Sequence, residues 1–314
     1  MQETLPIHFA PLQGYTDAPY RNAHAMCFGG VDTYHTPFVR FEKGAFRPKD
    51  IRDIEEKNNS VAHLIPQLIA PNVEKAETIL NLFIEKGYQE ADINLGCPFP
   101  LLAKRHNGAG LLPYPEEVMS LLSIVRKYPQ IHFSVKMRLG WENPEECLNL
   151  MSFLNDLPLK QITLHPRLGK QQYNGVVDLA GFAAVYEHCQ HPLIYNGDLT
   201  STKEIQQLVS RFPKLAGVMM GRGLLANPAL ALEYKEGRIL TGKEMGERLQ
   251  KMHSMLFTHY EQQLEGGELQ LLNKIKAFWE YLVPDANKKL LKAIHKSSSL
   301  AKYQQAVSSL IAQL

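Results

Sequence analysis

The sequence is poor in cysteine, and its few cysteines are not arranged as metal ligands. Four occur in 314 residues, at positions 27, 97, 147 and 189, with no Cys-x-x-Cys pair and no paired histidine spacing. Widely spaced cysteines of this kind are typical of reduced thiols in a cytosolic protein and argue against a structural zinc site. We therefore expect a cytoplasmic chain that binds no metal.

Long hydrophobic runs are also missing. No stretch approaches the roughly 20 consecutive apolar residues that a membrane-spanning helix needs. The first ten residues, MQETLPIHFA, lack the basic and then apolar segments of a signal peptide. We expect neither export nor a membrane partner. The sequence also has no Gly-x-Gly-x-x-Gly after a predicted strand and no Gly-x-x-x-x-Gly-Lys-[Ser/Thr], so it supports neither a Rossmann nor a P-loop nucleotide site.

Net charge is small, at +2, but it is unevenly distributed. Between Lys274 and Lys302 the sequence has seven lysines and only Glu280 and Asp285 as acids, a local charge of +5 that leaves the rest at about −3. A basic segment near one end of the chain suits a polyanionic partner. A solvated, lysine-rich helical face is the alternative interpretation.

A chain of 314 residues that is 45% hydrophobic can bury a substantial core. Short apolar runs rich in β-branched residues recur through its first 220 residues. These runs are 7–12, 32–39, 61–69, 91–97, 132–139, 161–166, 192–197 and 216–223. Most gaps hold a helical pattern, as in 73–87, where Ala76, Leu80 and Phe83 share one face. Strands alternating with helices predict a parallel sheet covered by helices, and eight units favour a (β/α)8 TIM barrel over a doubly wound sheet.

The strand pattern stops after about residue 240. Apolar residues then recur at helical spacing, for example at Met245, Leu249, Met252 and Leu256. This pattern predicts a small α-helical bundle, with Trp279 in its core. We therefore divide the chain into a barrel over 1–240 and a helical domain over 241–314.

Nearly every predicted strand ends in polar or glycine residues that a hydrophobic core would not select. These residues are Gln13 and Gly14, Gln67, Asn94 and Cys97, Lys136 and Arg138, His165 and Arg167, Asn196 to Asp198, and Gly221 to Gly223. In a (β/α)8 barrel these strand ends face one mouth, where sites are built. Singly they have simpler explanations, such as an interior amide, a core histidine or a turn. Together they predict a functional site at the mouth.

Lys136 and the Gly221–Arg222 pair carry the most chemical information. Lys136 stands in an apolar strand, and because a lysine is rarely buried without a partner, it predicts an anion or an electron-rich ring nearby. Glycine lets backbone N–H groups approach a phosphate, and Arg222 would add a bidentate contact. The residues thus predict a barrel enzyme that holds a phosphate-bearing cofactor, with Lys136 and Gln67 at its head and Gly221 and Arg222 at its tail.

Cys97 lies where the fourth predicted strand ends, in the stretch DINLGCPFP (92–100). It could be a buried filler, a metal ligand, a nucleophile or a proton donor. Metal ligation lacks partners, and the polar residues at the other strand ends argue against a filler. A nucleophile remains open, although no base stands beside it in the sequence.

Seven motifs occur in order along the chain. They are APLQGYTDAPYR (10–21), INLGCP (93–98), NGAGLL (107–112), KMRLGW (136–141), LHPR (164–167), NGD (196–198) and MGRG (220–223). As a set they resemble the bacterial tRNA-dihydrouridine synthases, FMN-dependent flavoproteins that reduce specific uridines in tRNA. The resemblance spans about 10–225 and extends through KIKAFWEYL (274–282). It implies an FMN-binding barrel, a helical domain that grips tRNA, and NADPH as reductant.

The resemblance also assigns residues by motif. It implies FMN contacts from Pro11, Leu12, Gln13, Gln67, Lys136, His165, Asn196, Gly197, Asp198, Gly221 and Arg222. It implies tRNA contacts from Arg40, Asn94, Arg138, Tyr173, Lys274, Lys276 and Tyr281. Cys97 would be the catalytic acid, giving its proton to C5 of uracil after hydride from flavin N5 reaches C6. A thiol suits this role while it stays protonated, so a strongly depressed pKa would be a handicap.

Three positions depart from the family pattern: Gln13, Pro100 and Pro166 stand where acidic, small or polar, and glycine residues are more usual. They concern subfamily and substrate position, since none removes a reacting group. TPFVR and KIKAFWEYL favour the D-loop near position 16, and a monomer is the default. The alternatives are an FMN barrel acting on a free pyrimidine, of dihydroorotate or dihydropyrimidine type, and a non-catalytic RNA-binding barrel. The basic helical segment argues against the first, and Cys97 with Lys136 against the second.

Overall fold

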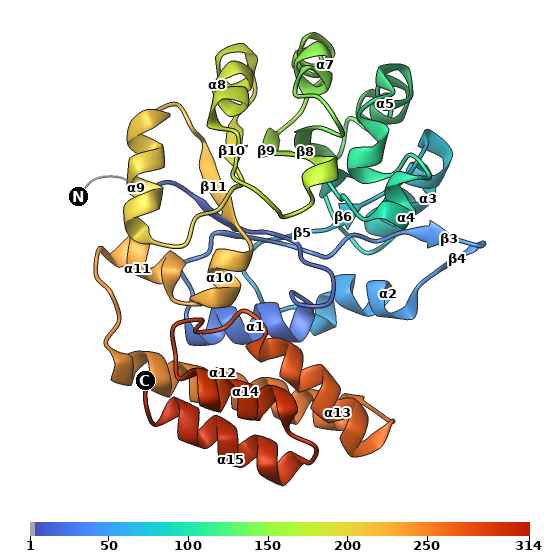
Figure 1. Ribbon diagram of the computed structural model, residues 1–314. Helices are drawn as coiled ribbons and strands as arrows, with labels where there is room; N and C mark the ends of the chain where they lie inside the picture. Colours follow the sequence, from blue (N-terminus) through green and yellow to red (C-terminus); the bar gives the residue numbers. More distant parts are fainter. Residues whose placement is uncertain (1–3) are drawn as a thin grey trace.

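The computed structural model describes residues 4–314, so residues 1–3 of the predicted N-terminal segment lie outside the described residues. A parallel sheet ringed by helices forms the larger part, and a group of helices packs beneath it in Figure 1. Within residues 4–314, none of the helices combines the length and the apolar character needed to cross a membrane.

The central sheet contains nine strands in the order β5-β2-β1-β11-β10-β9-β8-β7-β6. Their bounds are β1 (Ile7–Phe9), β2 (Thr33–His35), β5 (Leu64–Ile65), β6 (Gln67–Leu68), β7 (Glu90–Leu95), β8 (His132–Gly140), β9 (Gln161–Leu168), β10 (Leu193–Tyr195) and β11 (Gly217–Met220). Every predicted strand run overlaps one of these strands, and the pairs are parallel.

The sheet closes into a barrel through one interrupted strand. β5 pairs with β2 and β6 pairs with β7, and only Pro66 separates β5 from β6. Proline has no N–H to donate, which interrupts the ladder, but the Pro66 carbonyl still accepts from Asp92 N at 3.0 Å. Counting β5 and β6 as one segment gives eight strands, and the predicted (β/α)8 barrel is confirmed.

Helices cover the outside of the barrel (Figure 1). They are α1 (Ala18–Cys27), α3 (Val73–Glu85), α5 (Pro115–Leu122), α6 (Ile124–Lys127), α7 (Glu145–Asn155), α8 (Leu179–His188), α9 (Thr202–Arg211), α10 (Arg222–Ala226) and α11 (Leu230–Glu236). Loops between strands and helices contain β3 (Phe41–Glu42), β4 (Ala45–Phe46), α2 (Pro48–Ile54), η1 (Glu56–Asn58), α4 (Pro100–Ala103), η2 (Gly108–Leu111) and η3 (Gly169–Gln171). Ala76, Leu80 and Phe83 of α3 are fully buried, as the helical spacing predicts.

The barrel interior is polar where barrels usually pack Val, Ile and Leu. Buried Asp92 accepts hydrogen bonds from Ser134 Oγ at 2.7 Å and from Gln67 Nε2 at 2.6 Å. Buried His8 Nδ1 and His35 Nε2 lie 3.4 Å apart, and burial lowers the pKa of each imidazole to about 3, so both are neutral. The apolar core lies instead between the sheet and its helices.

The C-terminal region is helical, as its pattern predicts. It contains α12 (Gly242–Gln263), α13 (Gly267–Lys276), η4 (Ala277–Trp279), α14 (Lys288–Lys296) and α15 (Leu300–Ile311). Trp279 is buried and its Nε1 donates to Tyr303 Oη at 2.8 Å, which confirms its place in the core. The region packs on α1 through Asp17, whose carboxylate accepts from Tyr260 Oη at 2.8 Å and pairs with Lys274 Nζ at 2.7 Å.

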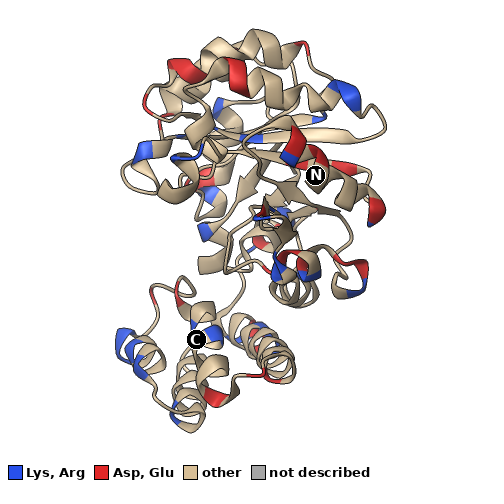
Figure 2. Cartoon of the chain, turned by 90° about the vertical axis from the view of Figure 1, so that its right-hand side faces the viewer, with Lys and Arg blue, Asp and Glu red and all other residues tan. Residues whose placement is uncertain are grey.

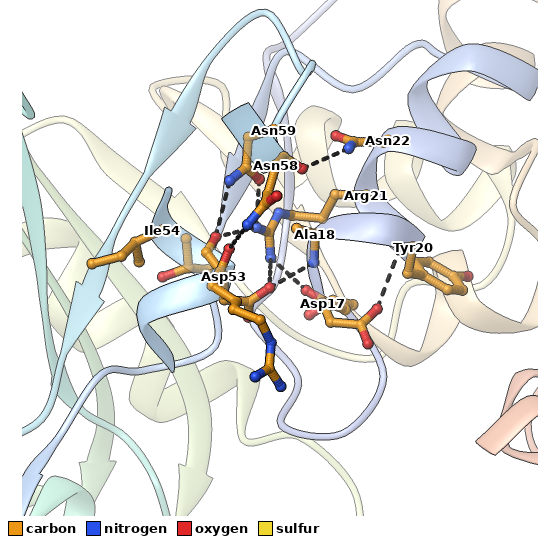
Figure 3. A network of polar contacts seen from close by, with 12 residues as sticks. Asp17, Ala18, Tyr20, Arg21, Asn22, Asp53, Ile54, Asn58 and Asn59 are labelled. Atoms are coloured by element: carbon orange, nitrogen blue, oxygen red, sulfur yellow. Dashed lines mark hydrogen bonds and ion pairs between the residues drawn. The ribbon is translucent and has the colours of Figure 1, made fainter. Parts of the chain in front are cut away.

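The loop from Ala10 to Asp17 is anchored by the buried Arg21 (Figure 3). Its guanidinium donates to Thr16 O at 2.7 Å, to Asp53 O at 2.8 Å and to Asn59 Oδ1 at 2.7 Å. Asp53 Oδ1 in turn accepts from Ala18 N at 2.6 Å. This network holds the loop that follows β1 in place at the mouth of the barrel.

Candidate active site

A cavity of about 950 Å³ opens at the mouth of the barrel, where the carboxyl ends of the strands meet. Loops that follow the strands form most of its wall, and Glu280, Tyr281 and Pro284 of the C-terminal region complete it. Cavities of roughly 300–1,000 Å³ take cofactor-sized ligands. The cavity, called the cleft below, therefore belongs to both the barrel and the helical region.

The cleft is much more basic than the chain as a whole. Within the described part of the chain, its lining has seven Lys and Arg residues against two acids. The basic residues are Arg40, Arg47, Lys49, Lys136, Arg138, Arg167 and Arg222, and the acids are Asp198 and Glu280. A concave surface with an excess of five positive charges, in a chain whose net charge is +2, focuses its field on an anionic ligand.

Most of the predicted site residues line this cleft. They are Pro11, Leu12, Gln13, Arg40, Asn94, Cys97, Lys136, Arg138, His165, Tyr173, Asn196, Gly197, Asp198, Gly221, Arg222 and Tyr281. Gln67, Lys274 and Lys276 are not among the lining residues.

Gln67 lies beneath the cleft instead of in it. Its side chain is fully buried, its Nε2 donates to Asp92, and its Oε1 accepts from Asn94 Nδ2 at 2.7 Å. Both ends of the amide are engaged within the barrel. Gln67 therefore supports Asn94 from below, and its contact with a cofactor stays a prediction.

Asn94 also has a structural task that the sequence did not reveal. Its Oδ1 accepts from Gly96 N at 2.9 Å and from Cys97 N at 2.8 Å, which shapes the turn after β7. A continuous chain of hydrogen bonds therefore runs from Ser134 through Asp92, Gln67 and Asn94 to the Cys97 backbone. The barrel interior sets the position of Cys97.

The Cys97 thiol is held protonated by its surroundings. Burial raises the pKa of the thiol, although a hydrogen bond from the Phe99 backbone amide and the charge of Arg138 oppose this. At neutral pH the sulfur therefore carries its proton. This state suits an acid and not a thiolate nucleophile.

Gly108 packs directly against Cys97. It has φ +60°, and a Cβ added to it would lie 2.9 Å from Cys97 Cβ and 2.7 Å from Cys97 O. Ala109 N donates to the same carbonyl at 3.0 Å. The role of Gly108 was missed from the sequence. The two glycines of the NGAGLL motif (107–112) were the signal that could have indicated this close approach.

Lys136 points an unpaired charge into the cleft. Within residues 4–314 its Nζ takes part in none of the hydrogen bonds or ion pairs, although the charge of Asp92 lies near enough to favour the ammonium form. Burial, aided by repulsion from Arg138, lowers the pKa of Lys136 to about 8. Such an ammonium is stabilised by an anionic or electron-rich ligand.

Two arginines bind the Asp198 carboxylate in the wall of the cleft. The Asp198 carboxylate accepts from Arg167 Nη1 and Arg222 Nη2, each at 2.9 Å. Burial alone would raise the pKa of Asp198, but the hydrogen bonds and charges of these arginines lower it overall. Arg167 is almost fully buried. The sequence places it directly after the apolar run 161–166, and a charge at the end of a strand was the signal for this role.

Tyr173 and Arg138 form one wall of the cleft. The Tyr173 ring lies near two guanidinium groups, with centroid distances of 5.5 Å to Arg138 and 4.9 Å to Arg222. Arg138 also donates to Gly96 O and Leu168 O, each at 2.9 Å. Arg138 is therefore fixed to the backbone on two sides, next to the Cys97 turn.

His165 is neutral and has a defined tautomer. Burial, with nearby positive charges, lowers the pKa of His165 well below its usual value. Arg167 Nη1 lies 3.3 Å from His165 Nε2, and a guanidinium can only donate, so Nε2 accepts. The ring proton is thereby on Nδ1.

The predicted RNA-contact lysines Lys274 and Lys276 are both engaged within the chain. Lys274 pairs with Asp17 and lies 4.6 Å above the Tyr260 ring, and Lys276 donates to Ser297 O. The Lys274 ammonium is therefore paired with a carboxylate, whereas Lys276 is hydrogen-bonded to a neutral carbonyl, and contact of either with tRNA stays a prediction. Besides Lys302 on α15, the exposed lysines of the basic segment are on α14, and they take part in no ion pair among residues 4–314. They are Lys288, Lys289, Lys292 and Lys296, and Figure 2 shows blue bands side by side on one helix of the lower, helical part.

The described residues contain no group of three or more His, Cys, Asp or Glu side chains placed to hold a metal ion.

The chain is similar to proteins of one family. The family model described as "Dihydrouridine synthase (Dus)" matches residues 8–311. A "Probable tRNA-dihydrouridine synthase" of Rhodobacter capsulatus is 25% identical over 270 residues, which cover 82% of each chain. The tRNA-dihydrouridine(16) synthase of Shigella flexneri is 28% identical over 222 residues, 69% of this chain and 66% of the relative.

Solved structures of low sequence identity share the fold. Morphinone reductase superposes with a TM-score of 0.51 at 12% identity, over 76% of this chain and 88% of that one. The old yellow enzyme from Trypanosoma cruzi gives 0.50 at 15% identity, over 76% and 91%. At these identities the likeness shows the barrel fold alone.

Proposed function

The chain belongs to the dihydrouridine synthase family, and on this premise we propose that it reduces specific uridines of tRNA to 5,6-dihydrouridine, with FMN as cofactor and NADPH as reductant. One observation carries the proposal: a single cleft holds an excess of positive charge, the protonated Cys97 thiol and the unpaired Lys136 ammonium. A phosphate-bearing cofactor and a polyanionic substrate both match that charge.

The residues of the cleft fit FMN. Lys136 offers its unpaired positive charge to the electron-rich ring, and Arg222, which is about one-third exposed, can reach a phosphate while it pairs with Asp198. A Cβ on Gly221 would lie 3.3 Å from Ala10 Cβ, so glycine lets the end of β11 pack closely against the loop after β1 in this wall of the cleft. When bound, FMN supplies the hydride for C6 of uracil and is reloaded by NADPH.

Cys97 completes the reduction by protonating C5. Hydride addition at C6 places negative charge toward C5 and O4 of the base, the S–H bond breaks, and a C5–H bond forms. The thiolate left behind is stabilised by the charges of Arg138 and Lys136 and regains a proton from water. Burial keeps the sulfur protonated before the step. The hydrogen bond from Cys97 N to Asn94 fixes the backbone that carries the thiol.

The remaining residues divide between cofactor and RNA. Pro11, Leu12, Gln13, His165, Asn196, Gly197 and Asp198 line the cleft on the cofactor side of the proposal, and Arg40, Asn94, Arg138, Tyr173 and Tyr281 on the RNA side. We propose residues 1–240 as the catalytic barrel and 241–314 as the RNA-binding domain, with the α14 lysines as its phosphate contacts. A cytoplasmic monomer is part of the same proposal.

Position 16 of the D-loop is the proposed target. The Shigella flexneri relative is named for that position, and this chain carries the TPFVR and KIKAFWEYL segments that favour it. Mapping dihydrouridine in tRNA from cells that lack this gene tests the position directly.

A Cys97→Ala variant tests the chemistry. We expect purified wild-type protein to absorb as a flavoprotein and to lower the uridine content of unmodified tRNA with NADPH, while free uracil and orotate do not react. Cys97→Ala should keep its flavin and its reduction by NADPH but lose turnover on tRNA, because no other thiol lines the described cleft. Full turnover in the variant would refute the assignment of the acid, and turnover of free orotate would refute the RNA substrate.

A further inference from the structure

Two large apolar side chains are exposed beside the proposed acid. Phe99 is 52% exposed and Leu101 is 63% exposed, and both follow Cys97 within four residues. The Phe99 ring lines the cleft, whereas Leu101 lies on α4 just outside the lining. Exposing an aromatic ring at a site mouth costs hydration free energy, which a bound partner can recover.

The backbone around Phe99 is rigid. Pro98 and Pro100 flank it and fix the backbone φ on both sides. Leu102 N and Ala103 N both donate to Phe99 O, at 2.9 Å each. α4 cannot shift toward η2, because a Cβ on Gly110 would already lie 2.4 Å from Ala103 Cα. A ligand that contacts this ring pays little entropy for ordering the backbone.

The ring is also close to the thiol along the chain. Only Pro98 separates Phe99 from Cys97, and both residues line the cleft. The ring of Tyr173, also a cleft aromatic, lies 5.5 Å from the Arg138 guanidinium and 4.9 Å from that of Arg222. Phe99 has no such ring or cation partner within residues 4–314, so its face is available to a ligand.

Basic residues follow the exposed ring closely in the chain. Lys104 and Arg105 are exposed at the end of α4 and form no ion pair within residues 4–314, and Arg40, which pairs with Glu42, lines the same cleft as Phe99. An exposed aromatic face beside free cations is the combination that binds single-stranded nucleic acid, through base stacking and phosphate contacts.

We propose that Phe99 stacks on the nucleobase next to the reacting uridine of the RNA substrate, with Leu101 extending this apolar surface. The inference rests on the proposed function and adds a residue that stabilises the RNA with the target base unstacked. A base can reach the cleft only after it leaves its stack, and its neighbour then loses a stacking face. The Phe99 ring replaces that face, and Lys104 and Arg105 hold the phosphates beside it.

The test combines a protein change with a substrate change. Phe99→Ala and Phe99→Trp are compared on unmodified tRNA whose nucleotide 5′ or 3′ of the target uridine is intact or abasic. Phe99→Ala should lower kcat/KM on intact tRNA by roughly tenfold or more, and Phe99→Trp should retain most of it. One of the two abasic substrates should lose a similar factor with wild-type protein and lose little more with Phe99→Ala, because both changes remove the same stacked pair.

The control variant is Met26→Ala, whose side chain is 60% exposed near the end of α1, outside the proposed RNA-binding domain, and does not line the cleft. It should behave as wild type on every substrate. Flavin content and reduction by NADPH are measured for each variant, so that a folding defect in Phe99→Ala is recognised. If Phe99→Ala is misfolded, the comparison of wild type with Phe99→Trp on the abasic substrates decides. Independent, multiplying effects of the two changes, or wild-type kcat/KM in Phe99→Ala, overturn the inference. Wild-type protein that forms no dihydrouridine instead refutes the proposed function itself.

Discussion

At the scale of single residues, the chemistry of Cys97 depends on neighbours that are distant in sequence. Burial keeps its thiol protonated, Asn94 caps its turn, and Gly108 leaves room for its side chain. The sequence could identify Cys97 because cysteine is rare and stands at a strand end. It could not identify the task of Gln67 or Asn94, because an amide can meet a ligand or a neighbouring side chain equally well, and only the fold decides between them.

Gly108 can be tested against a matched glycine. Gly108→Ala and Gly87→Ala both place alanine at positive φ, +60° and +84°, but nothing lies within 4 Å of a Cβ on Gly87. Each change should lower the free energy of unfolding by about 1 kcal/mol from backbone strain. Only Gly108→Ala should also displace Cys97 and lower turnover on tRNA, by roughly tenfold or more. Thermal unfolding and single-turnover rates measure the two effects, and equal turnover in both variants would contradict the role of Gly108.

If FMN binds as proposed, Lys136 should make its binding depend on pH. Its pKa of about 8 means that the ammonium is charged below that pH and neutral above it. Rising pH therefore removes the charge that faces the cofactor ring, and FMN affinity of the apoprotein should fall by up to tenfold per pH unit above about 8. Fluorescence titrations of FMN across pH 6–10 measure this, with Lys136→Met as the variant that loses the dependence. A flat profile in the wild type would show that the charge does not reach the cofactor.

At the scale of elements, periodicity predicts which segments are strands and helices but not which of their charges are free. The runs of eight strands and the stripes of α3 and α12 follow from spacing alone, so they could be found in the sequence. The partners of Lys274 and Lys276 are Asp17 and Ser297, far along the chain, so a local count of lysines treats all seven alike. The sequence likewise could not show that the barrel closes at Pro66. Closure there depends on β5 pairing with β2 and β6 pairing with β7, which are separate segments of the chain.

The two kinds of lysine should separate in experiment. Charge reversal of Lys288 and Lys292 on α14 should weaken tRNA binding and lower the salt dependence of the affinity by roughly one unit of slope per lost phosphate contact, without changing Tm. Lys274→Gln should instead lower stability by roughly 1–2 kcal/mol, because its partly buried ammonium, 28% exposed, binds the Asp17 carboxylate across the joint between barrel and helices. Salt titrations of tRNA binding and calorimetry distinguish them. Unchanged tRNA affinity in the α14 double variant would assign RNA binding to the cleft alone.

At the scale of the whole molecule, the cleft is where the fold adds most to the sequence. A chain of net charge +2 gives no sign of a strongly basic cavity, because the seven cations come from five separate segments between Arg40 and Arg222. The barrel brings them to one mouth, and the helical region adds Glu280 and Tyr281 to the rim. Fold class was predictable from alternation of elements, whereas the concentration of charge required knowing which strand ends face the same way.

Closure of the barrel also affects how the chain is made. β1 pairs with β2 on one side and with β11 on the other, so one edge of the first strand waits for residues 217–220 to be synthesised. At ribosomal rates that delay lasts roughly 10–40 s, during which the strand could pair with another nascent chain. β1 spans only Ile7–Phe9, and so short an edge offers little to a competing strand. The short length of β1 thus limits incorrect pairing during synthesis until β11 is available.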